Sequence, residues 1–357
     1  MRITCVVDST EFGGAERHVL SLAQGLFALG VRFRVITRES VLAEQLRQNG
    51  IETTVAPFDD LMRTVGIVRR TCSEQADIVH AHRWGAILAA ATALRGTETP
   101  LVCTVHSMFA PEARFSGRTE NAERLPQVIA REARQVVAIS QAVKETLVRH
   151  GVPEERVKVI YTGVRALPTV PPDLTGIPAI GFVGRLSFEK GPDLLLKAAA
   201  LLRQRAPSLR FNVHFIGDGQ MRSYLEEQAR LLGLDGCCRF FGFLRDPGPE
   251  AARLTLLAVP SRQEGMGLVI PEAMSAGIPV VGAAVGGIPE AVANGETGLL
   301  VPPENPGALA QALERLLIDA EQRRCYGERS RQVWAERFDL HRFTQDHLHL
   351  YRSLLAR

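Results

Sequence analysis

The sequence predicts an α/β protein with two domains, each a parallel sheet covered by helices. Short apolar strand-like runs alternate with helical stretches along almost the whole chain. A proline-rich interruption divides this alternation near the middle of the sequence. The length of 357 residues exceeds what one ordinary hydrophobic core organises, which favours two cores.

The first half supplies one complete alternating set. The helical stretches Ala15–Leu29 and Gln141–His150 are each followed by a glycine, Gly30 and Gly151, in the usual position after a helix. The expected strands are Ile3–Val7, Phe33–Thr37, Ile51–Ala56, Asp77–His80, Leu101–Val105, Val136–Ile139 and Val157–Ile160.

The stretch Arg165–Pro178 interrupts the pattern with several prolines and reads as a semi-rigid linker. The chain beyond it ends in a charged tail of helical pattern, Ala320–Arg357. The strands expected in this second set are Ala179–Val183, Phe211–Ile216, Arg239–Phe241, Leu254–Val259, Pro279–Gly282 and Gly298–Leu300.

Composition excludes several classes of protein. A net charge of +3 is too small to imply bulk nucleic-acid binding, and no apolar run approaches the ~20 residues that span a bilayer. The start of the chain runs directly into a strand and lacks the features of a signal peptide. The six cysteines are scattered without metal-ligand spacing and read as small buried hydrophobes. We therefore expect a cytoplasmic protein.

Two glutamates eight positions apart, Glu264 and Glu272, are the most informative local feature. Glu264 belongs to the loop after the expected strand Leu254–Val259, and Glu272 to the opening turn of the next helix. Gly265 and Gly267 let the intervening backbone approach a ligand closely. Amide groups and a helix N-terminus at the carboxyl end of a strand bind anions. Two carboxylates beside an anion site suit a ligand with phosphates and hydroxyls, such as a sugar nucleotide.

This Glu-x7-Glu pattern, within EGMGLVIPEAMSAGIPVV, resembles the signature of the family-four retaining glycosyltransferases of the GT-B fold (glycosyl transferases group 1). Tyr161-Thr162-Gly163-Val164 departs from the PNGV motif that family members often carry. Four further blocks resemble the family in the expected order: FGGAERH (Phe12–His18), GRLSFEKG (Gly184–Gly191), VGGIPE (Val285–Glu290) and NGETGLLVPP (Asn294–Pro303).

The resemblance implies two Rossmann-like domains whose parallel sheets face each other across a cleft. It assigns residues 1–167 to an acceptor-binding domain and 168–339 to a nucleotide-sugar-binding domain. It also implies that a C-terminal helix at about 340–357 packs back on the first domain.

The implied reaction moves a hexose-type sugar from a nucleotide diphosphate sugar to an acceptor hydroxyl with retention of anomeric configuration. A UDP-sugar is favoured over a GDP-sugar as donor. The acceptor is a glycan or glycolipid, which points to synthesis of cell-surface polysaccharide, lipopolysaccharide or glycolipid. Neither a cofactor nor a metal is expected, because Arg185 and Lys190 would neutralise the diphosphate leaving group.

The resemblance also assigns roles around the donor. Arg185 and Lys190 would hold the diphosphate, and Glu272 would accept hydrogen bonds from the ribose hydroxyls. Glu264 would face the donor sugar, as a hydrogen-bond acceptor or a stabiliser of developing positive charge. The backbone amides that would hold sugar and phosphate oxygens are those of Gly265, Met266, Gly267 and Leu268.

Three residues of the first domain are candidates on the loop after its first strand. Gly13 and Gly14 would let the backbone approach the donor phosphate, and a simple hairpin-like turn is the alternative. Glu16, next on that loop, is an acceptor-side candidate.

His106 follows the expected strand Leu101–Val105, at the edge where such sheets bind ligands. The family often has a histidine here close to the transferred sugar, and a hydrogen-bonded structural histidine is the alternative. His80 and His82 share one face of the preceding strand. We expect no metal there, because the sequence offers this pair no third ligand nearby.

Two other classes of function stay open at this point. A sugar-nucleotide epimerase or a phosphorylase of similar fold would need a further catalytic base or a cofactor lysine, and neither is recognisable. A catalytically degenerate sugar-nucleotide binding module would not need the intact set Arg185, Lys190, Glu264 and Glu272.

Arginines of the first domain raise a membrane alternative. Arg63, Arg69 and Arg70 flank apolar residues, and a second segment carries Arg114, Arg118, Arg124, Arg131 and Arg134. These could hold the protein peripherally at the inner face of the cell membrane if the acceptor is lipid-linked. We favour a solvated helix face instead, because acidic residues interleave the second segment and the net charge is small.

Overall fold

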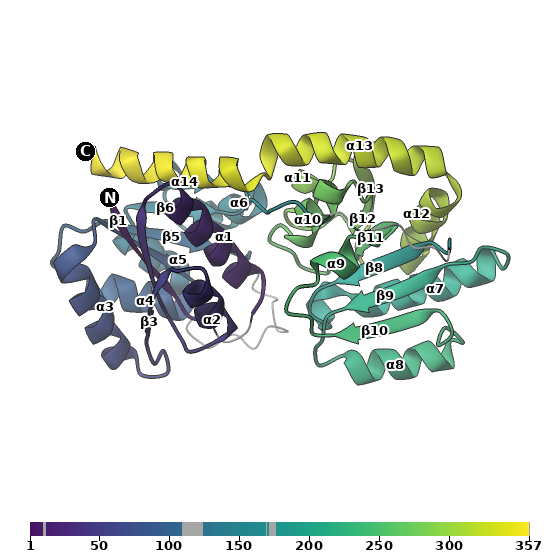
Figure 1. Cartoon of the computed structure of the whole chain (residues 1–357), viewed down its shortest axis with the longest axis horizontal. Helices are drawn as coiled ribbons and strands as arrows, with labels where there is room; N and C mark the ends of the chain where they lie inside the picture. Colours follow the sequence, from purple (N-terminus) through teal and green to yellow (C-terminus); the bar gives the residue numbers. More distant parts are fainter. Residues whose placement is uncertain (10–11, 109–123, 169, 171–175, 357) are drawn as a thin grey trace. The chain divides into compact units, whose positions relative to one another are not determined.

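The structure is a computed structural model that describes residues 1–9, 12–108, 124–168, 170 and 176–356 (Figure 1). Side chains of residues 73–75 are not described. The chain forms two compact units. The first unit holds Met1–Gly163 together with Leu340–Arg357, and the second holds Val164–Asp339.

The first unit alternates strands and helices. Its strands are β1 (Arg2–Val7), β2 (Arg32–Thr37), β3 (Glu52–Val55), β4 (Ile78–His82), β5 (Leu101–Val105), β6 (Gln135–Ala138) and β7 (Val157–Val159). Its helices are α1 (Gly14–Ala28), α2 (Val41–Gln48), α3 (Leu61–Gln75), α4 (Trp84–Ala93), α5 (Leu125–Glu132), α6 (Gln141–Arg149) and α14 (Leu340–Leu355).

The first sheet is seven-stranded and parallel, in the order β3-β2-β1-β4-β5-β6-β7. Its central strands are almost fully buried, as continuous apolar runs in a sheet covered on both faces must be. The strand order reverses between β1 and β4. In open α/β sheets the ligand site lies beyond the carboxyl ends of the strands at such a reversal.

The tail helix α14 packs against α1 and completes the first core (Figure 1). Phe343 and Tyr351 are among the largest fully buried side chains of the described chain. Thr344 approaches α1 so closely that a β-carbon at Gly25 would collide with its hydroxyl. Without the tail, this apolar surface of α1 would be exposed to water.

The second unit repeats the alternation. Its strands are β8 (Ala179–Val183), β9 (Asn212–Ile216), β10 (Cys238–Gly242), β11 (Leu256–Val259), β12 (Val280–Ala283) and β13 (Gly298–Val301). Its helices are α7 (Pro192–Arg205), α8 (Arg222–Leu231), α9 (Gly248–Ala251), α10 (Val269–Ala276), α11 (Ile288–Ala291), α12 (Pro306–Ile318) and α13 (Ala320–Arg337).

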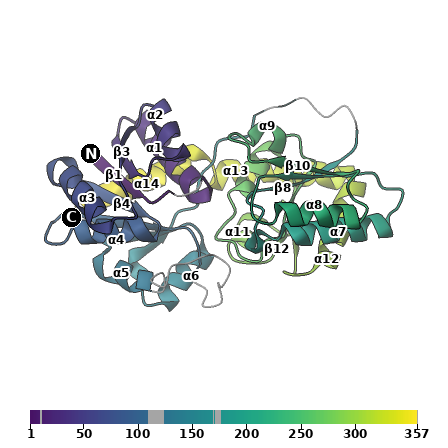
Figure 2. The same cartoon turned by 90° about the horizontal axis from the view of Figure 1, so that it is seen from below.

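The second sheet is six-stranded and parallel, in the order β10-β9-β8-β11-β12-β13. Helices α7 and α12 pack against each other over a core that includes Phe182, Phe215 and Leu256 (Figure 2). Here the strand order reverses between β8 and β11. The loops after these two strands are therefore the expected ligand-binding edge.

The predicted fold class is confirmed: two parallel α/β sheets covered by helices. Most strand bounds differ from the expected ones by one or two residues; β4, for example, continues through His82 instead of ending at His80. The register explains this, since His82 pairs with both Val7 and Thr104 on the neighbouring strands.

Some expectations fall outside the described residues. They include the arginines Arg114 and Arg118 and part of the linker 165–178. Among the helices that are described, each is too short or too polar to cross a bilayer.

Candidate functional site

Two loops of the second unit meet at the reversal point of its sheet. The loop after β8 contains Arg185 and a short 3-10 turn, Phe188–Lys190, and leads into α7. The loop after β11 contains Glu264 and leads into α10. At Gly191, φ is +66° and a β-carbon would collide with the carbonyl oxygen of Pro260, so glycine is required where the two loops touch.

Lys190 and Glu264 join these loops directly. The Lys190 Nζ donates to Glu264 Oε2 at 2.7 Å, and Ser261 Oγ donates to the same oxygen at 3.3 Å. The Glu264 side chain is only 10% exposed, whereas that of Lys190 is 33% exposed. The nearly buried Glu264 carboxylate thus holds the partly exposed Lys190 ammonium where the two loops meet.

Arg262, in the loop after β11, also connects this loop to the loop after β8 and to the start of α7. It donates to both carboxylate oxygens of Asp193 at 2.8 and 2.9 Å, to Glu304 at 2.6 Å and to the Phe188 carbonyl at 2.8 Å. Its guanidinium also lies 3.8 Å from the centre of the Phe188 ring. Such bidentate, stacked contacts restrict the loop that carries Lys190. The sequence reasoning missed this group.

The predicted amide segment runs from Gly265 to Leu268 and ends at the start of α10. Gly267 has φ +79°, and a β-carbon there would press on the Glu264 side chain at 3.3 Å. Glu272 lies in the first turn of α10, as predicted, and its side chain is half-buried. Met266 is fully buried, so this position contributes backbone rather than side chain to the surface.

The motif block after β12 borders the same edge. The Gly287 amide, in the loop after β12, donates to the Glu264 carbonyl at 3.3 Å. Asn294 accepts from the Leu300 amide at 2.9 Å and closes the turn before β13. This turn lies at the opposite edge of the sheet, where Gly298 pairs with Val280 at the amino end of β12. Arg185 is exposed. The structure thus brings Arg185, Lys190, Glu264 and the α10 N-terminus to one edge of one sheet.

The first unit has an equivalent edge after β1 and β4. Gly13 caps α1 and its amide donates to Glu16 Oε2 at 3.0 Å, while Arg83 donates to Glu16 Oε1 at 2.7 Å. Glu16 is 2% exposed and Arg83 is 38% exposed. Gly13 and Gly14 begin a helix, so the alternative of a hairpin-like turn is wrong. Arg83 has φ +70°, a strained value for a residue with a side chain.

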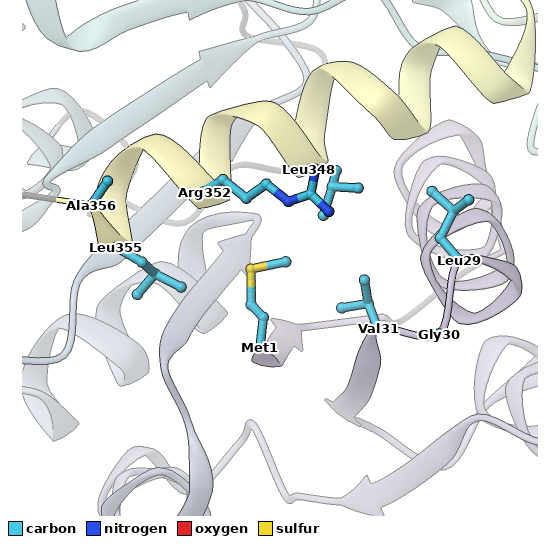
Figure 3. Close-up of a pocket in the computed structure, with 8 residues that line it drawn as sticks. All are labelled: Met1, Leu29, Gly30, Val31, Leu348, Arg352, Leu355 and Ala356. Atoms are coloured by element: carbon cyan, nitrogen blue, oxygen red, sulfur yellow. The ribbon is translucent and has the colours of Figure 1, made fainter.

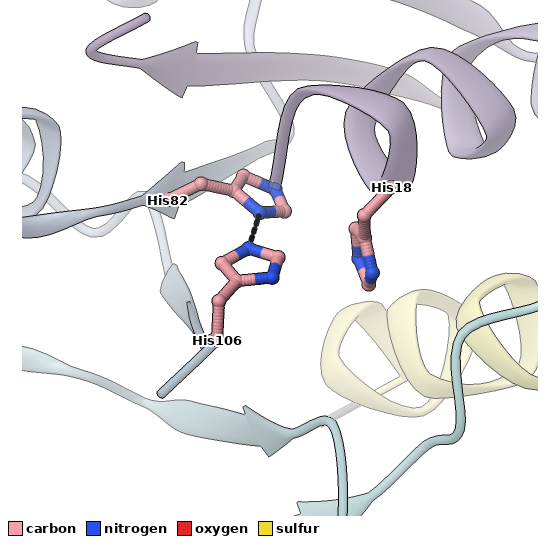
Figure 4. A group of neighbouring side chains, drawn as sticks. All are labelled: His18, His82 and His106. Carbon is pink, nitrogen blue, oxygen red and sulfur yellow. Dashed lines mark hydrogen bonds between the residues drawn. The ribbon is translucent and has the colours of Figure 1, made fainter. Parts of the chain in front are cut away.

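His106 stands beside two other histidines at this edge (Figure 4). His82 Nδ1 and His106 Nε2 share a hydrogen bond of 3.0 Å. The ring of His18, from α1, has its centre 4.8 Å from that of His106 and 5.4 Å from that of His82. We expected no third ligand near the pair His80 and His82. For His82 this expectation is wrong, because the fold brings His18 of α1 and His106, which follows β5, close to it.

Burial keeps these imidazoles uncharged. It is the main cause that holds the pKa of His18 and of His82 well below the ordinary value, with the neighbouring histidines adding to it. Burial, and then the positive charge of Arg83, lowers the pKa of His106 to about 3. The three rings are therefore neutral at physiological pH.

A second layer of hydrogen bonds, from the tail helix, from β5 and from the loop after β7, supports the histidines. His80 Nδ1 pairs with the Tyr351 hydroxyl at 2.6 Å and its Nε2 with Thr104 Oγ1 at 2.7 Å. His18 Nδ1 pairs with Thr162 Oγ1 at 2.8 Å, at the position where the family often has asparagine. These pairs explain why polar side chains are tolerated in the core.

A pocket of about 530 Å³ lies elsewhere in the first unit (Figure 3). It is next to the amino end of β1, opposite the edge at which parallel sheets bind ligands, so we do not assign it to the reaction. Its lining consists of Met1, Leu29, Gly30, Val31, Leu348, Arg352, Leu355 and Ala356.

Of the arginines considered for membrane contact, Arg69 donates to the Ala93 carbonyl at 3.2 Å, which engages it within the protein.

Two family models match the chain, one over each unit. The model described as Glycosyltransferase Family 4 matches residues 12–166, and that described as Glycosyl transferases group 1 matches residues 177–319.

Relatives and solved structures agree with this match. A D-inositol 3-phosphate glycosyltransferase of Corynebacterium aurimucosum is 31% identical over 90% of this chain and 86% of that protein. The structure of Anabaena Alr3699/HepE in complex with UDP-glucose has a TM-score of 0.89 at 27% identity, over 99% of this chain and 100% of that one. Sucrose-phosphate synthase from Thermosynechococcus elongatus, at 22% identity and a TM-score of 0.81 over 99% and 100%, shares the fold.

The two parallel sheets, the loops at their reversal points and these likenesses define a glycosyltransferase of the GT-B fold. The chain belongs to glycosyltransferase family 4. An epimerase or a phosphorylase is not favoured.

Proposed function

We propose that this glycosyltransferase moves a hexose-type sugar from a nucleotide diphosphate sugar to an acceptor hydroxyl, with retention and without a divalent metal. The observation that carries the proposal is the Lys190–Glu264 contact of 2.7 Å at the reversal point of the second sheet. It joins a cation suited to a phosphate with a carboxylate suited to sugar hydroxyls.

The donor roles follow from this arrangement. Arg185 and Lys190 neutralise the diphosphate as it leaves, which is the charge that a metal would otherwise balance. The amides from Gly265 to Leu268 and the N-terminus of α10 bind phosphate and sugar oxygens. Glu272 accepts from the ribose hydroxyls. The complex of the Anabaena protein with UDP-glucose supports UDP as the nucleotide, with GDP the alternative.

His106 and Glu264 are the groups that we assign to the transferred sugar. A neutral His106 accepts or donates one hydrogen bond without placing a charge beside the donor. Glu264 accepts from a sugar hydroxyl or stabilises positive charge that develops at the anomeric carbon. Gly13 and Gly14 let the backbone at the start of α1 approach the donor phosphate.

The acceptor that we propose is a glycan or glycolipid hydroxyl, bound by the first unit near Glu16. A small anionic acceptor is a second candidate. The relative from Corynebacterium aurimucosum is named for D-inositol 3-phosphate, and Arg83 is a half-exposed cation close enough to depress the pKa of His106. A phosphate group on the acceptor could form a charge-assisted hydrogen bond with Arg83.

Thermal unfolding with a panel of UDP- and GDP-sugars tests the donor, since a ligand at 100 times its Kd adds about 2.7 kcal/mol of stability. Release of nucleoside diphosphate is then measured with an acceptor extract and with D-inositol 3-phosphate. Proton NMR of the product reports its anomeric configuration. Release of UDP with a retained linkage is expected. A folded chain that neither binds nor consumes any of these donors would contradict the proposal, as would an inverted product.

A further inference from the structure

The histidine cluster of the first unit brings three imidazole rings close together (Figure 4). One ring nitrogen each of His18, His82 and His106 lies within 4.8 Å of the others. The three rings come from α1, β4 and the residue that follows β5, so the backbone of the core fixes their spacing. His18 and His82 are fully buried, and His106 is half-buried.

Two of these rings hold nitrogens that satisfy no hydrogen bond within the described structure: Nε2 of His18 and Nε2 of His82. A buried polar atom without a partner is costly, and in a native fold it asks for an explanation. His18 also has the support that metal-binding histidines usually have. Its Nδ1 pairs with the Thr162 hydroxyl at 2.8 Å, which orients the ring and leaves Nε2 available.

We infer that His18, His82 and His106 form a binding site for a late first-row divalent metal ion of the Zn²⁺ class. Metal–nitrogen bonds of about 2.0–2.1 Å in a tetrahedral site place ligand nitrogens about 3.3 Å apart. His82 Nδ1 and His106 Nε2 are 3.0 Å apart and share a hydrogen bond, so an ion would have to replace that bond, with all three rings turned toward it. Imidazole ligands favour Zn²⁺, Co²⁺, Ni²⁺ and Cu²⁺ over Mg²⁺ or Ca²⁺.

Occupation of this site would remove His106 from the donor sugar. The ion would therefore inhibit transfer, a consequence that rests on the proposed function, whereas binding itself does not. Zn²⁺ inhibition is compatible with a reaction that uses Arg185 and Lys190 in place of a metal.

Titration of the full metal-free chain with Co²⁺ tests the site, because tetrahedral Co²⁺ has intense visible absorption that surface sites of higher coordination lack. The variants are His18→Gln and His106→Gln. The matched control is His80→Gln, an equally buried histidine of the same strand as His82. Both of its nitrogens are engaged, by Tyr351 and Thr104, so it has none to offer a metal. Circular dichroism and thermal unfolding establish that each variant is folded, and half-buried His106 gives the less disruptive change.

One Co²⁺ per chain, displaced by Zn²⁺, is the expected result. Each ligand variant should weaken binding by about 100-fold or more, beyond the 10–100-fold typical of losing a supporting residue. The His80→Gln control should keep the tetrahedral spectrum. Absence of that spectrum in the wild-type chain, or equal binding by folded His106→Gln, would overturn the inference. Because the titration contains no sugar nucleotide, its outcome is independent of whether the proposed reaction is correct.

Discussion

Lys190 Nζ donates to Glu264 Oε2 at 2.7 Å, although 74 residues separate the two in sequence. The contact joins the loop after β8 to the loop after β11. It also means that Glu264 neutralises Lys190 before a donor arrives, so that an incoming diphosphate exchanges one anionic partner for another. Before the donor binds, the positive charge of Lys190 is therefore balanced and its ammonium is held in position.

Lys190→Ala and Arg185→Ala should each reduce kcat by about 10²-fold or more, because each removes a charge that stabilises the leaving diphosphate. Steady-state release of UDP measures this. Arg205→Ala is the control, since Arg205 pairs with Glu314 on the surface of the same unit at 3.1 Å. Near-normal kcat in a folded Lys190→Ala protein would remove the assignment.

Asp193→Asn should lower the free energy of unfolding by about 3 kcal/mol, because it leaves Arg262 without its bidentate carboxylate in a nearly buried setting. Urea unfolding of the variant, compared with the exposed substitution Glu227→Gln, measures the loss. If the two variants are equally stable, Arg262 does not hold the loops after β8 and β11 together as we describe.

The Asp193 effect should depend on pH. Burial by itself would raise the pKa of this carboxyl, but the hydrogen bonds and charge of Arg262, helped by Lys197, hold the pKa below the ordinary value. A depressed folded-state pKa adds stability that is complete above pH about 4 and is lost as pH falls through the folded pKa. The stability difference between wild type and Asp193→Asn should therefore be constant near neutrality and shrink below pH about 4. A difference that changes between pH 6 and 8 would require another group.

Tyr351→Phe should destabilise the first unit by about 1–3 kcal/mol, since it leaves the buried His80 Nδ1 without its partner at 2.6 Å. Chemical denaturation reports the change. Tyr224→Phe, an exposed tyrosine of the second unit, should be neutral. Equal stability of both variants would mean that the tail helix is held by apolar packing alone.

Much of this architecture could be predicted from local sequence. Continuous apolar runs gave the strands, and motif spacing placed Lys190 and Glu264 in one site, because carboxyl ends of adjacent parallel strands share an edge. Arg262 and Asp193 could not be paired in this way. They are 69 residues apart, and neither lies in a periodic pattern that predicts a partner. The only indication of their role was that each lies close in sequence to a donor-binding motif.

The histidine cluster shows a different limit. His82 ends β4 and His106 follows the neighbouring strand β5, so the sequence could have predicted that they meet. His18 was missed because it lies on the buried face of α1, where its position depends on how that helix packs on the sheet. The spacing of residues in the sequence does not show which strands a helix residue will contact.

Activity should persist in EDTA, because fixed cations take the place of a metal at the diphosphate. The measurement is UDP release by chelated, metal-free protein, with and without added Mg²⁺ or Mn²⁺. Loss of turnover in EDTA that either ion restores would contradict this prediction. Removal of inhibitory Zn²⁺ should leave activity unchanged or raise it.

The central claim is that the edge carrying Lys190 and Glu264 binds the nucleotide diphosphate of the donor. Calorimetric titration of UDP into the wild-type chain and into Lys190→Ala tests it most directly, since no acceptor is needed. We predict one UDP per chain and a loss in affinity of about tenfold or more in the variant, the equivalent of ~1.4 kcal/mol or more for a charge-assisted phosphate contact. Equal affinity in the two proteins, or no binding of UDP or GDP by the wild-type chain, would contradict it.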